Sequence, residues 1–315
     1  MKKAWMRILE IVLTSQEGKK QLKFGANWEQ GKDDLSISVK GTKFMSTLKD
    51  RCTVEISNLS YSEVIQIIQG KFYDITIYAG YREGNRIKVF DGGILHISNA
   101  IDDTKSNRII ILCTSKLVAR YGQSRINLTI NSNINMYAAL NLICRKAGIP
   151  VTNLSTQLKG KVIQNVFAKN ESVANWINDF ATADDSLIVS SDSIAGSYVD
   201  VFDANRSNRR VIPLNSSTID LSGGYPQLTN EGLSLSIMPT FEFMCGDVIS
   251  IDNSLINMPT RSQAEVSRNY GYYLDKDGHY MIFQIDFNLA NRSSQFSFTL
   301  ECKSRSLVSN YFGKE

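Results

Sequence analysis

The chain has 315 residues, of which 43% are hydrophobic and 21% are charged, a composition typical of folded globular proteins. It excludes a disordered chain, and the length suits two or three domains of average size. The 35 basic and 31 acidic residues are scattered along the sequence, so the net charge of +4 does not by itself favour nucleic-acid binding.

The first third of the chain alternates apolar and polar residues with a period of two, which predicts β-strands. A strand from Arg7 to Ser15 is followed by a turn at Glu17-Gly18 and by a returning strand at 21–24, which together predict a hairpin. Further strands are predicted at residues 35–40, 52–56, 73–79, 86–90, 94–97 and 108–114, with the pair Gly92-Gly93 as a break between two of them.

One short helix interrupts these strands. Ser60 and Glu63 form a capping box, and Gly70 marks the stop. We expect this helix to plug the end of a barrel and the whole unit to be able to fold alone, because a closed sheet hides its edges. Its predicted apolar face consists of Val64, Ile65, Ile67 and Ile68.

The hydrophobic period changes to that of helices near residue 131. One helix is predicted to begin with Ser132 or Asn133 as its cap and to end at Gly148-Ile149-Pro150. A second helix is predicted at 171–183, and strands follow at 187–189 and 198–202, which indicates a compact α+β module. The apolar stripes of the two helices are Met136, Ala139, Leu140, Ile143 and Cys144, and Val173, Trp176, Ile177 and Phe180.

The final third returns to strand patterns, at residues 210–214, 233–237, 248–251, 280–287 and 295–301. Two β-rich ends therefore bracket a helical middle. We predict a mainly β, α+β protein with three domains: 1–120, 121–203 and 204–315.

The five cysteines indicate reduced thiols, most of them in the core. Their number is odd, their spacing is wide and no C-x-x-C pair occurs. The N-terminal apolar run is interrupted by Glu10 and has no cleavage site, and no uncharged apolar segment approaches the about 20 residues of a membrane helix. We therefore expect assembly in a cytoplasm without stable membrane insertion.

Neither histidine is a convincing catalytic base. His96 lies in an alternating strand and should be at the surface, and His279 follows a predicted hairpin turn and should be exposed. The basic loop at 206–210 is interpreted as a solvated connection between strands.

Three pairs of aspartates are the candidates for carboxylate chemistry: Asp102 with Asp103, Asp184 with Asp185, and Asp275 with Asp277. All lie in predicted turns, where solvation explains them. The segment 275–278 lacks the downstream glutamate of a calcium loop. The sequence therefore predicts no catalytic, cofactor-binding or metal-binding residue, no cofactor and no enzyme activity.

Several short segments, taken in order, resemble the baseplate hub family of phage tails, which includes late control protein D and the tube-initiator hubs of contractile tails and related injection machines. Residues 72–81, 89–94 and 108–113 are similar to its first tube domain. Residues 224–233, 238–239 and 245–249 are similar to its second tube domain, and 271–302 to its terminal hairpin. The order of these segments is more specific than any one of them. The positions that carry the motifs are Gly80, Gly92, Gly93, Gly224, Pro226, Gly232, Pro239, Gly246 and Asp247.

The resemblance implies two tube-like β-barrels in each chain, bracketing or interleaved with the middle module. Three chains then make a ring with pseudo-sixfold symmetry, which joins a hexameric tail tube to a trimeric central spike. The implied role is structural: a virion protein of the tail baseplate that initiates the tube and lines the channel for DNA. Implied partners are other copies of the chain, the tube protein, the spike protein, other baseplate proteins and, as a further candidate, the tape measure protein.

Two further expectations follow from that role. Strands that face the channel should be neutral or acidic, because a basic lumen would hold DNA. The chain shows no lysozyme or needle domain, so wall cleavage and membrane piercing are expected of a separate spike protein.

Two alternatives stay open at this point. The aromatic segment 269–273 suits a carbohydrate- or receptor-binding β-protein, if its tyrosines form an exposed platform. A hydrolase would need a carboxylate pair such as Asp184 and Asp185.

Overall fold

The structure is a computed structural model that describes residues 7–15, 18, 20–25, 35–45, 50–81, 84, 86–101, 107–149, 153–154, 156–164, 167–182, 187–190, 200–203, 210–215, 219, 224–229, 232–257, 274–275 and 277–304.

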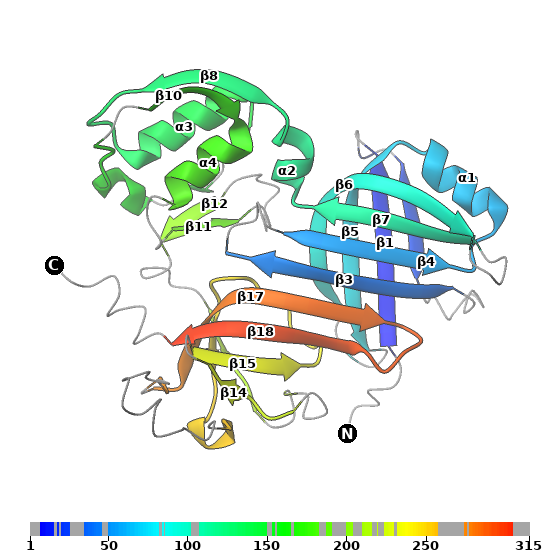
Figure 1. Ribbon diagram of the computed structural model, residues 1–315. Coiled ribbons are helices and arrows are strands. Elements are labelled where there is room, and N and C mark those ends of the chain that lie inside the picture. The colour runs from blue at the N-terminus through cyan, green and yellow to red at the C-terminus, as the bar shows by residue number, and fades with distance from the viewer. Residues whose placement is uncertain are drawn as a thin grey trace, which may run out of the picture.

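One sheet of 13 strands contains strands from both ends of the chain (Figure 1). Its order is β14-β15-β18-β17-β3-β4-β7-β6-β5-β1-β2, and β16 pairs with both β17 and β13. All of these pairs are antiparallel except β13 with β16. The N-terminal strands are β1 (Arg7–Ser15), β2 (Gln21–Gly25), β3 (Ser36–Phe44), β4 (Arg51–Ser57), β5 (Phe72–Tyr81), β6 (Ile87–Ile101) and β7 (Asn107–Thr114). The C-terminal strands are β13 (Val211–Pro213), β14 (Gln227–Leu228), β15 (Gly232–Ile237), β16 (Val248–Ser250), β17 (His279–Ala290) and β18 (Phe296–Ser304).

Strand β17 joins the two halves of the sheet. Residues 279–281 of β17 pair with β16, and residues 284–290 pair with β3, so a single strand continues from one half into the other. Within this junction Phe287 lies opposite Gly41. The Phe287 ring also packs on the Phe90 ring of β6, with the two ring centroids 6.1 Å apart. The C-terminal half therefore contributes directly to the core of the N-terminal half.

The turn between β17 and β18 makes a second contact between the halves. Phe296 packs edge-on against Tyr81, with ring centroids 5.6 Å apart. The Arg7 guanidinium donates hydrogen bonds to the carbonyl oxygens of Ser293 and Ser294 and lies 5.1 Å from the centroid of the Phe296 ring. Both sides of the β17–β18 hairpin thus contact N-terminal strands.

Helix α1 (Tyr61–Gln69) begins as the sequence predicts, with both hydrogen bonds of the capping box between Ser60 and Glu63. Val64 and Ile67 are buried in the core that α1 shares with the sheet. The predicted apolar face is too broad, however, because Ile65 is only partly buried and Ile68 is 51% exposed.

The middle of the chain forms a separate module with two small sheets (Figure 1). Its buried side chains, among them Leu140, Ile143 and Trp176, make a hydrophobic cluster distinct from that of the large sheet. Strand β8 pairs with β10, and β12 lies between β11 and β9. The elements are α2 (Lys116–Tyr121), β8 (Arg125–Ile130), α3 (Met136–Lys146), β9 (Asn153–Leu154), the 3-10 helix η3 (Thr156–Gly160), β10 (Phe167–Ser172), α4 (Val173–Thr182), β11 (Leu187–Ser190) and β12 (Asp200–Asp203).

The predicted mainly β, α+β class is confirmed, but several details of the sequence analysis are wrong. The pair Gly92-Gly93 does not break a strand, because β6 runs through both residues. The N-cap of α3 is Asn135, whose side chain accepts a hydrogen bond from the Ala138 amide, and neither Ser132 nor Asn133. The short elements α2, β8, β9, η3 and β10 were not predicted. The domain boundaries at 120 and 203 stay a prediction.

Candidate functional site

The surface of the large sheet opposite the core spans six neighbouring strands and is mostly polar, with Phe283 of β17 and with Ile110 and Leu112 of β7 as apolar exceptions. Side chains alternate between the two sides of a strand, so the residues between the buried ones form this second side. We refer to it as the polar face. It comprises Ser234 and Ser236 of β15, Ser297, Thr299, Glu301 and Lys303 of β18, Gln284, Asp286 and Asn288 of β17, Ser38, Lys40 and Thr42 of β3, Arg51, Thr53 and Glu55 of β4, and Arg108, Ile110 and Leu112 of β7.

Several charged side chains of the polar face form hydrogen bonds with other side chains of the same face. The Asp286 carboxylate accepts hydrogen bonds from the Thr42 hydroxyl (2.5 Å) and the Gln284 amide (2.8 Å). Ser234 donates to Glu301 at 2.7 Å. Four basic and three acidic side chains are mixed across the six strands, so the polar face carries no continuous basic stripe.

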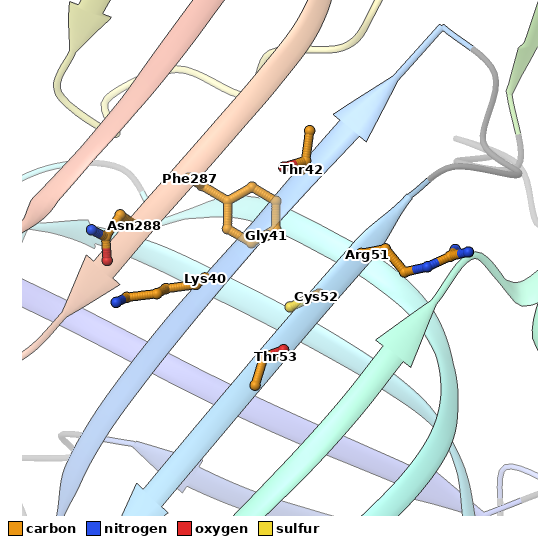
Figure 2. Close-up of a pocket in the computed structure, with 8 residues that line it drawn as sticks. All are labelled: Lys40, Gly41, Thr42, Arg51, Cys52, Thr53, Phe287 and Asn288. Carbon is orange, nitrogen blue, oxygen red and sulfur yellow. The ribbon is translucent and has the colours of Figure 1, made fainter.

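A shallow depression of about 400 Å³ lies in the polar face where β17, β3 and β4 run side by side (Figure 2). Gly41 lies in its lining, and a methyl group at this position would collide with the Phe287 ring and lie 2.5 Å from the Arg51 carbonyl oxygen. The eight lining residues are Lys40, Gly41, Thr42, Arg51, Cys52, Thr53, Phe287 and Asn288.

The two cations of the depression do not converge. Figure 2 shows Lys40 and Asn288 beside each other, whereas Arg51 extends away from them. The Arg51 guanidinium donates to the Thr114 hydroxyl (3.0 Å) and to the Asp50 carbonyl oxygen (2.8 Å). The eight lining residues include no histidine and no carboxylate.

The predicted positions of the two histidines are partly right. His96 is exposed on β6, as expected. His279 is half-buried at the start of β17 and not exposed as the sequence suggested. The loop at 206–209, the tyrosines at 270–273 and the carboxylates Asp102, Asp103, Asp184 and Asp185 lie outside the described residues.

Asp275 is buried, which contradicts its interpretation as a solvated turn residue. Its carboxylate accepts hydrogen bonds from the amides of Asp277 and His279, each at 3.0 Å, and from the Ser304 hydroxyl at 3.0 Å. The turn itself is present, since Gly278 donates to the Asp275 carbonyl oxygen at 3.2 Å. Asp275 therefore organises the start of β17 and ties it to the end of β18.

Asp247 is the motif position with the clearest structural role. Its carboxylate is buried and accepts hydrogen bonds from the Met244 amide (2.9 Å) and from two nitrogens of Arg210 (2.9 and 3.1 Å). The preceding Gly246 has a φ of +90°, which favours glycine. These contacts fix the loop before β16.

The remaining motif positions occupy turns and close approaches. Gly232 has a φ of +152° and lies against the backbone of β18. Gly92 and Gly93 approach the Phe90 ring and Ala119 of α2. Pro226 and Pro239 are buried in loops, Gly224 has a positive φ, and Gly80 is buried in β5. Their contribution to function stays a prediction.

All five cysteines are free, and four of them are buried. Burial raises the pKa of the Cys144 thiol to about 12. Burial also raises the pKa values of Cys52 and Cys302, for Cys52 together with a hydrogen bond to Cys113. Among the described residues, no group of three or more histidine, cysteine or acidic side chains could hold a metal ion, and no helix is long and apolar enough to cross a membrane.

No family model and no curated protein matches the sequence. The fold is nevertheless similar to solved structures. The 43 kDa tail protein of prophage MuSo2 from Shewanella oneidensis has a TM-score of 0.57 and 10% identity, over 94% of this chain and 97% of that chain. The tail protein from Neisseria meningitidis MC58 has a TM-score of 0.53 and 9% identity, over 94% and 96%.

A third similar structure belongs to a secretion machine. The E. coli c3393 protein is a component of the type VI secretion system with structural similarity to the T4 bacteriophage tail proteins gp27 and gp5. Its TM-score is 0.52 at 10% identity, over 85% of this chain and 73% of that chain. The fold described above is therefore one that phage tails and a secretion machine share.

Proposed function

We propose that this chain, which has the fold of phage tail proteins, is the hub of a tail baseplate or of a related injection machine. In this proposal three copies form a ring that joins a hexameric tube to a trimeric spike. The observation that carries it is the continuous sheet, in which β17 pairs with β3 and so links strands from both ends of the chain.

Symmetry explains why such a chain suits a junction. A ring of three copies has threefold symmetry, but two tube-like sheets in each copy place six similar units around the axis. A sixfold tube can dock on one side of the ring and a threefold spike on the other. Support for two units comes from the antiparallel groups β1–β7 and β14–β18, which are adjacent in the sheet.

We propose that the polar face lines the channel. Hydroxyl and amide groups bind a phosphate backbone weakly, whereas clustered lysine and arginine would retain it. On this face Arg108 lies 3.8 Å from Glu55, and Thr42 and Gln284 donate to Asp286. Mixed and partly paired charges favour a lumen through which DNA passes without being held. The role is mechanical, and the proposal includes no reaction.

Mass measurement of the purified chain, alone and with the tube and spike proteins of the same particle, tests this proposal. The expected result is a trimer that binds both partners and shortens the lag before the tube protein polymerises. Electron micrographs of the trimer should show a ring with six similar units around an open centre. A chain that remains monomeric in the assembled particle, or a ring with three units, would contradict the proposal.

A further inference from the structure

Two free cysteines face each other across neighbouring strands of the large sheet. Cys52 lies in β4 and Cys113 in β7, and these two residues are direct partners in the antiparallel pairing of the strands. Both side chains are 2% exposed and belong to the core of the large sheet. The two thiols share a hydrogen bond, so their sulfur atoms are close together. No C-x-x-C spacing indicates this contact in the sequence.

The backbone geometry of this pair is that of a disulfide. Residues directly opposite each other in an antiparallel pair have Cα atoms about 4.5 to 5.5 Å apart. A disulfide joins residues whose Cα atoms are about 4.4 to 6.8 Å apart. The register is regular from Arg51 opposite Thr114 to Ser57 opposite Arg108, so no bulge between β4 and β7 displaces the two cysteines. A bond between the sulfurs therefore requires rotation of the side chains but no movement of one strand along the other.

The other three cysteines lack such a partner. Cys144 is buried in the separate hydrophobic cluster of the middle module. Cys302 lies opposite Leu233 and Ile282, and Cys245 lies in the loop before β16. Among the described residues, only Cys52 and Cys113 are cysteines that face each other in the register of a sheet.

The surroundings of the pair make its thiols slow to react. Burial, the hydrogen bond to Cys113 and the charge of that neighbour raise the pKa of Cys52, and the positive charge of Lys43 opposes this shift. At neutral pH the thiol is therefore protonated, and the thiolate is the form that reacts. Cys52 also lines the depression in the polar face, so the pair lies beside an opening in the surface (Figure 2).

We propose that Cys52 and Cys113 are a disulfide site, which is reduced when the chain folds and is oxidised slowly afterwards to a bond that joins β4 to β7. Under the proposed function the chain folds in a reducing cell and works outside it, where disulfides persist. The bond would close a loop of about 60 residues, and a loop of this length reduces the entropy of the unfolded chain. Oxidation should therefore stabilise the N-terminal half of the large sheet.

The oxidant that we name for this step is a peroxide. The Cys52 thiolate attacks one oxygen of hydrogen peroxide, which gives a sulfenic acid on Cys52 and releases hydroxide. The Cys113 thiolate then attacks the Cys52 sulfur, forms the S–S bond and displaces the second oxygen as hydroxide. The protons that the two thiols have lost convert both hydroxides to water. Two thiols are thus oxidised and one peroxide is reduced.

Peroxide treatment of the full-length chain tests this inference. The variant Cys245→Ala is the parent, because it removes the cysteine that is not buried and leaves four thiols. Oxidation of the folded parent should leave two thiols, counted in denaturant, and digestion should give a peptide with Cys52 linked to one with Cys113. The rate at pH 9 should be about tenfold the rate at pH 8, because the thiolate fraction rises tenfold.

Thermal unfolding measures the consequence of the bond. The oxidised parent should melt about 5 °C higher than the reduced parent. Dithiothreitol should abolish this gain, since it reduces a disulfide but leaves methionine sulfoxide, the other product of peroxide, in place. Adding Cys113→Ala should abolish both the linked peptide and the gain. The matched control Cys144→Ala, which removes a buried thiol without a cysteine partner, should keep both.

The parent protein decides the inference even if the Cys113→Ala variant does not fold. Four remaining thiols, under conditions that oxidise the chain unfolded in urea, overturn the inference, and so does a linked peptide that joins any other two cysteines. A linked chain that melts no higher than the reduced chain overturns the stabilising role. None of these measurements requires the ring. A monomeric chain with the expected bond would therefore contradict the proposed function and leave this inference standing.

Discussion

Individual buried carboxylates stabilise the loops of the C-terminal half. The Asp247 carboxylate allows this stabilisation to be measured. In the variant Asp247→Ala the Arg210 guanidinium and the Met244 amide lose the carboxylate oxygen that accepts hydrogen bonds from both. We expect a loss of about 2 to 3 kcal/mol in the free energy of unfolding, because a buried acceptor is replaced and its donors are left unsatisfied. Urea titration followed by circular dichroism measures this loss.

The partner of Asp247 supplies the control. The Arg210 side chain is 51% exposed, so water can replace part of its interactions. Arg210→Gln should therefore cost roughly 1 kcal/mol or less. Equal losses in the two variants would show that the ion pair, and not the hydrogen bond to the Met244 amide, is the important interaction.

The buried thiols predict a loss of stability in alkali. The pKa of Cys144 is raised to about 12 in the folded chain. As the pH rises above the ordinary pKa of a cysteine thiol, the unfolded chain therefore releases this proton at a lower pH than the folded chain does. The stabilisation is complete below about pH 9 and declines by about 1.4 kcal/mol per pH unit above it. Urea titrations at pH 8, 9, 10 and 11 should show a shallower decline in Cys144→Ala than in the wild type. Parallel curves would show that Cys144 does not titrate in this range.

At the scale of elements, helix α2 is the link between the large sheet and the middle module. Leu117 is buried in the module core, while Ala119 lies against Gly93 of β6. A methyl group at Gly93 would collide with the Ala119 side chain, so Gly93→Ala should cost about 2 to 3 kcal/mol of unfolding free energy.

A double-mutant cycle checks this contact. Ala119→Gly alone should cost about 1 kcal/mol of helix propensity, and the double variant should lose less than the sum of the single losses. The control is Gly84→Ala, where a methyl group would make only ordinary contacts. Additive losses would mean that α2 does not depend on close approach to β6.

The same elements show what a sequence can and cannot predict. Strands with clear alternation, such as β4, and the capped helix α1 were found because their signals are local. The pair Gly92-Gly93 was misread because a glycine that makes room for Ala119 looks the same in sequence as a glycine that ends a strand. Asp275 was misread because its partner Ser304 is distant in sequence.

At the scale of the whole molecule, the pairing of β17 with β3 decides which parts can exist alone. No local sequence pattern predicts this pairing, because Phe287 and Gly41 are far apart in the sequence. The sequence suggested that the N-terminal β-rich unit could fold alone. In the structure β3 pairs with β17 as well as with β4, and Tyr81 and Phe90 pack against the rings of Phe296 and Phe287. We therefore predict that the N-terminal unit depends on the C-terminal half.

Fragments make this dependence measurable. A fragment of residues 1–120 should bind a hydrophobic dye and aggregate, because the unpaired edge of β3 and the exposed core invite association. A fragment of residues 115–204 should give a dispersed amide spectrum, because the middle module has its own buried cluster around Trp176. Mixing the first fragment with a separate fragment of residues 205–315 should restore its solubility, because β17 can then pair with β3. If the first fragment is soluble and well ordered alone, then the shared core contributes little to the N-terminal half, and the two ends of the chain are independent units that merely lie side by side in one sheet.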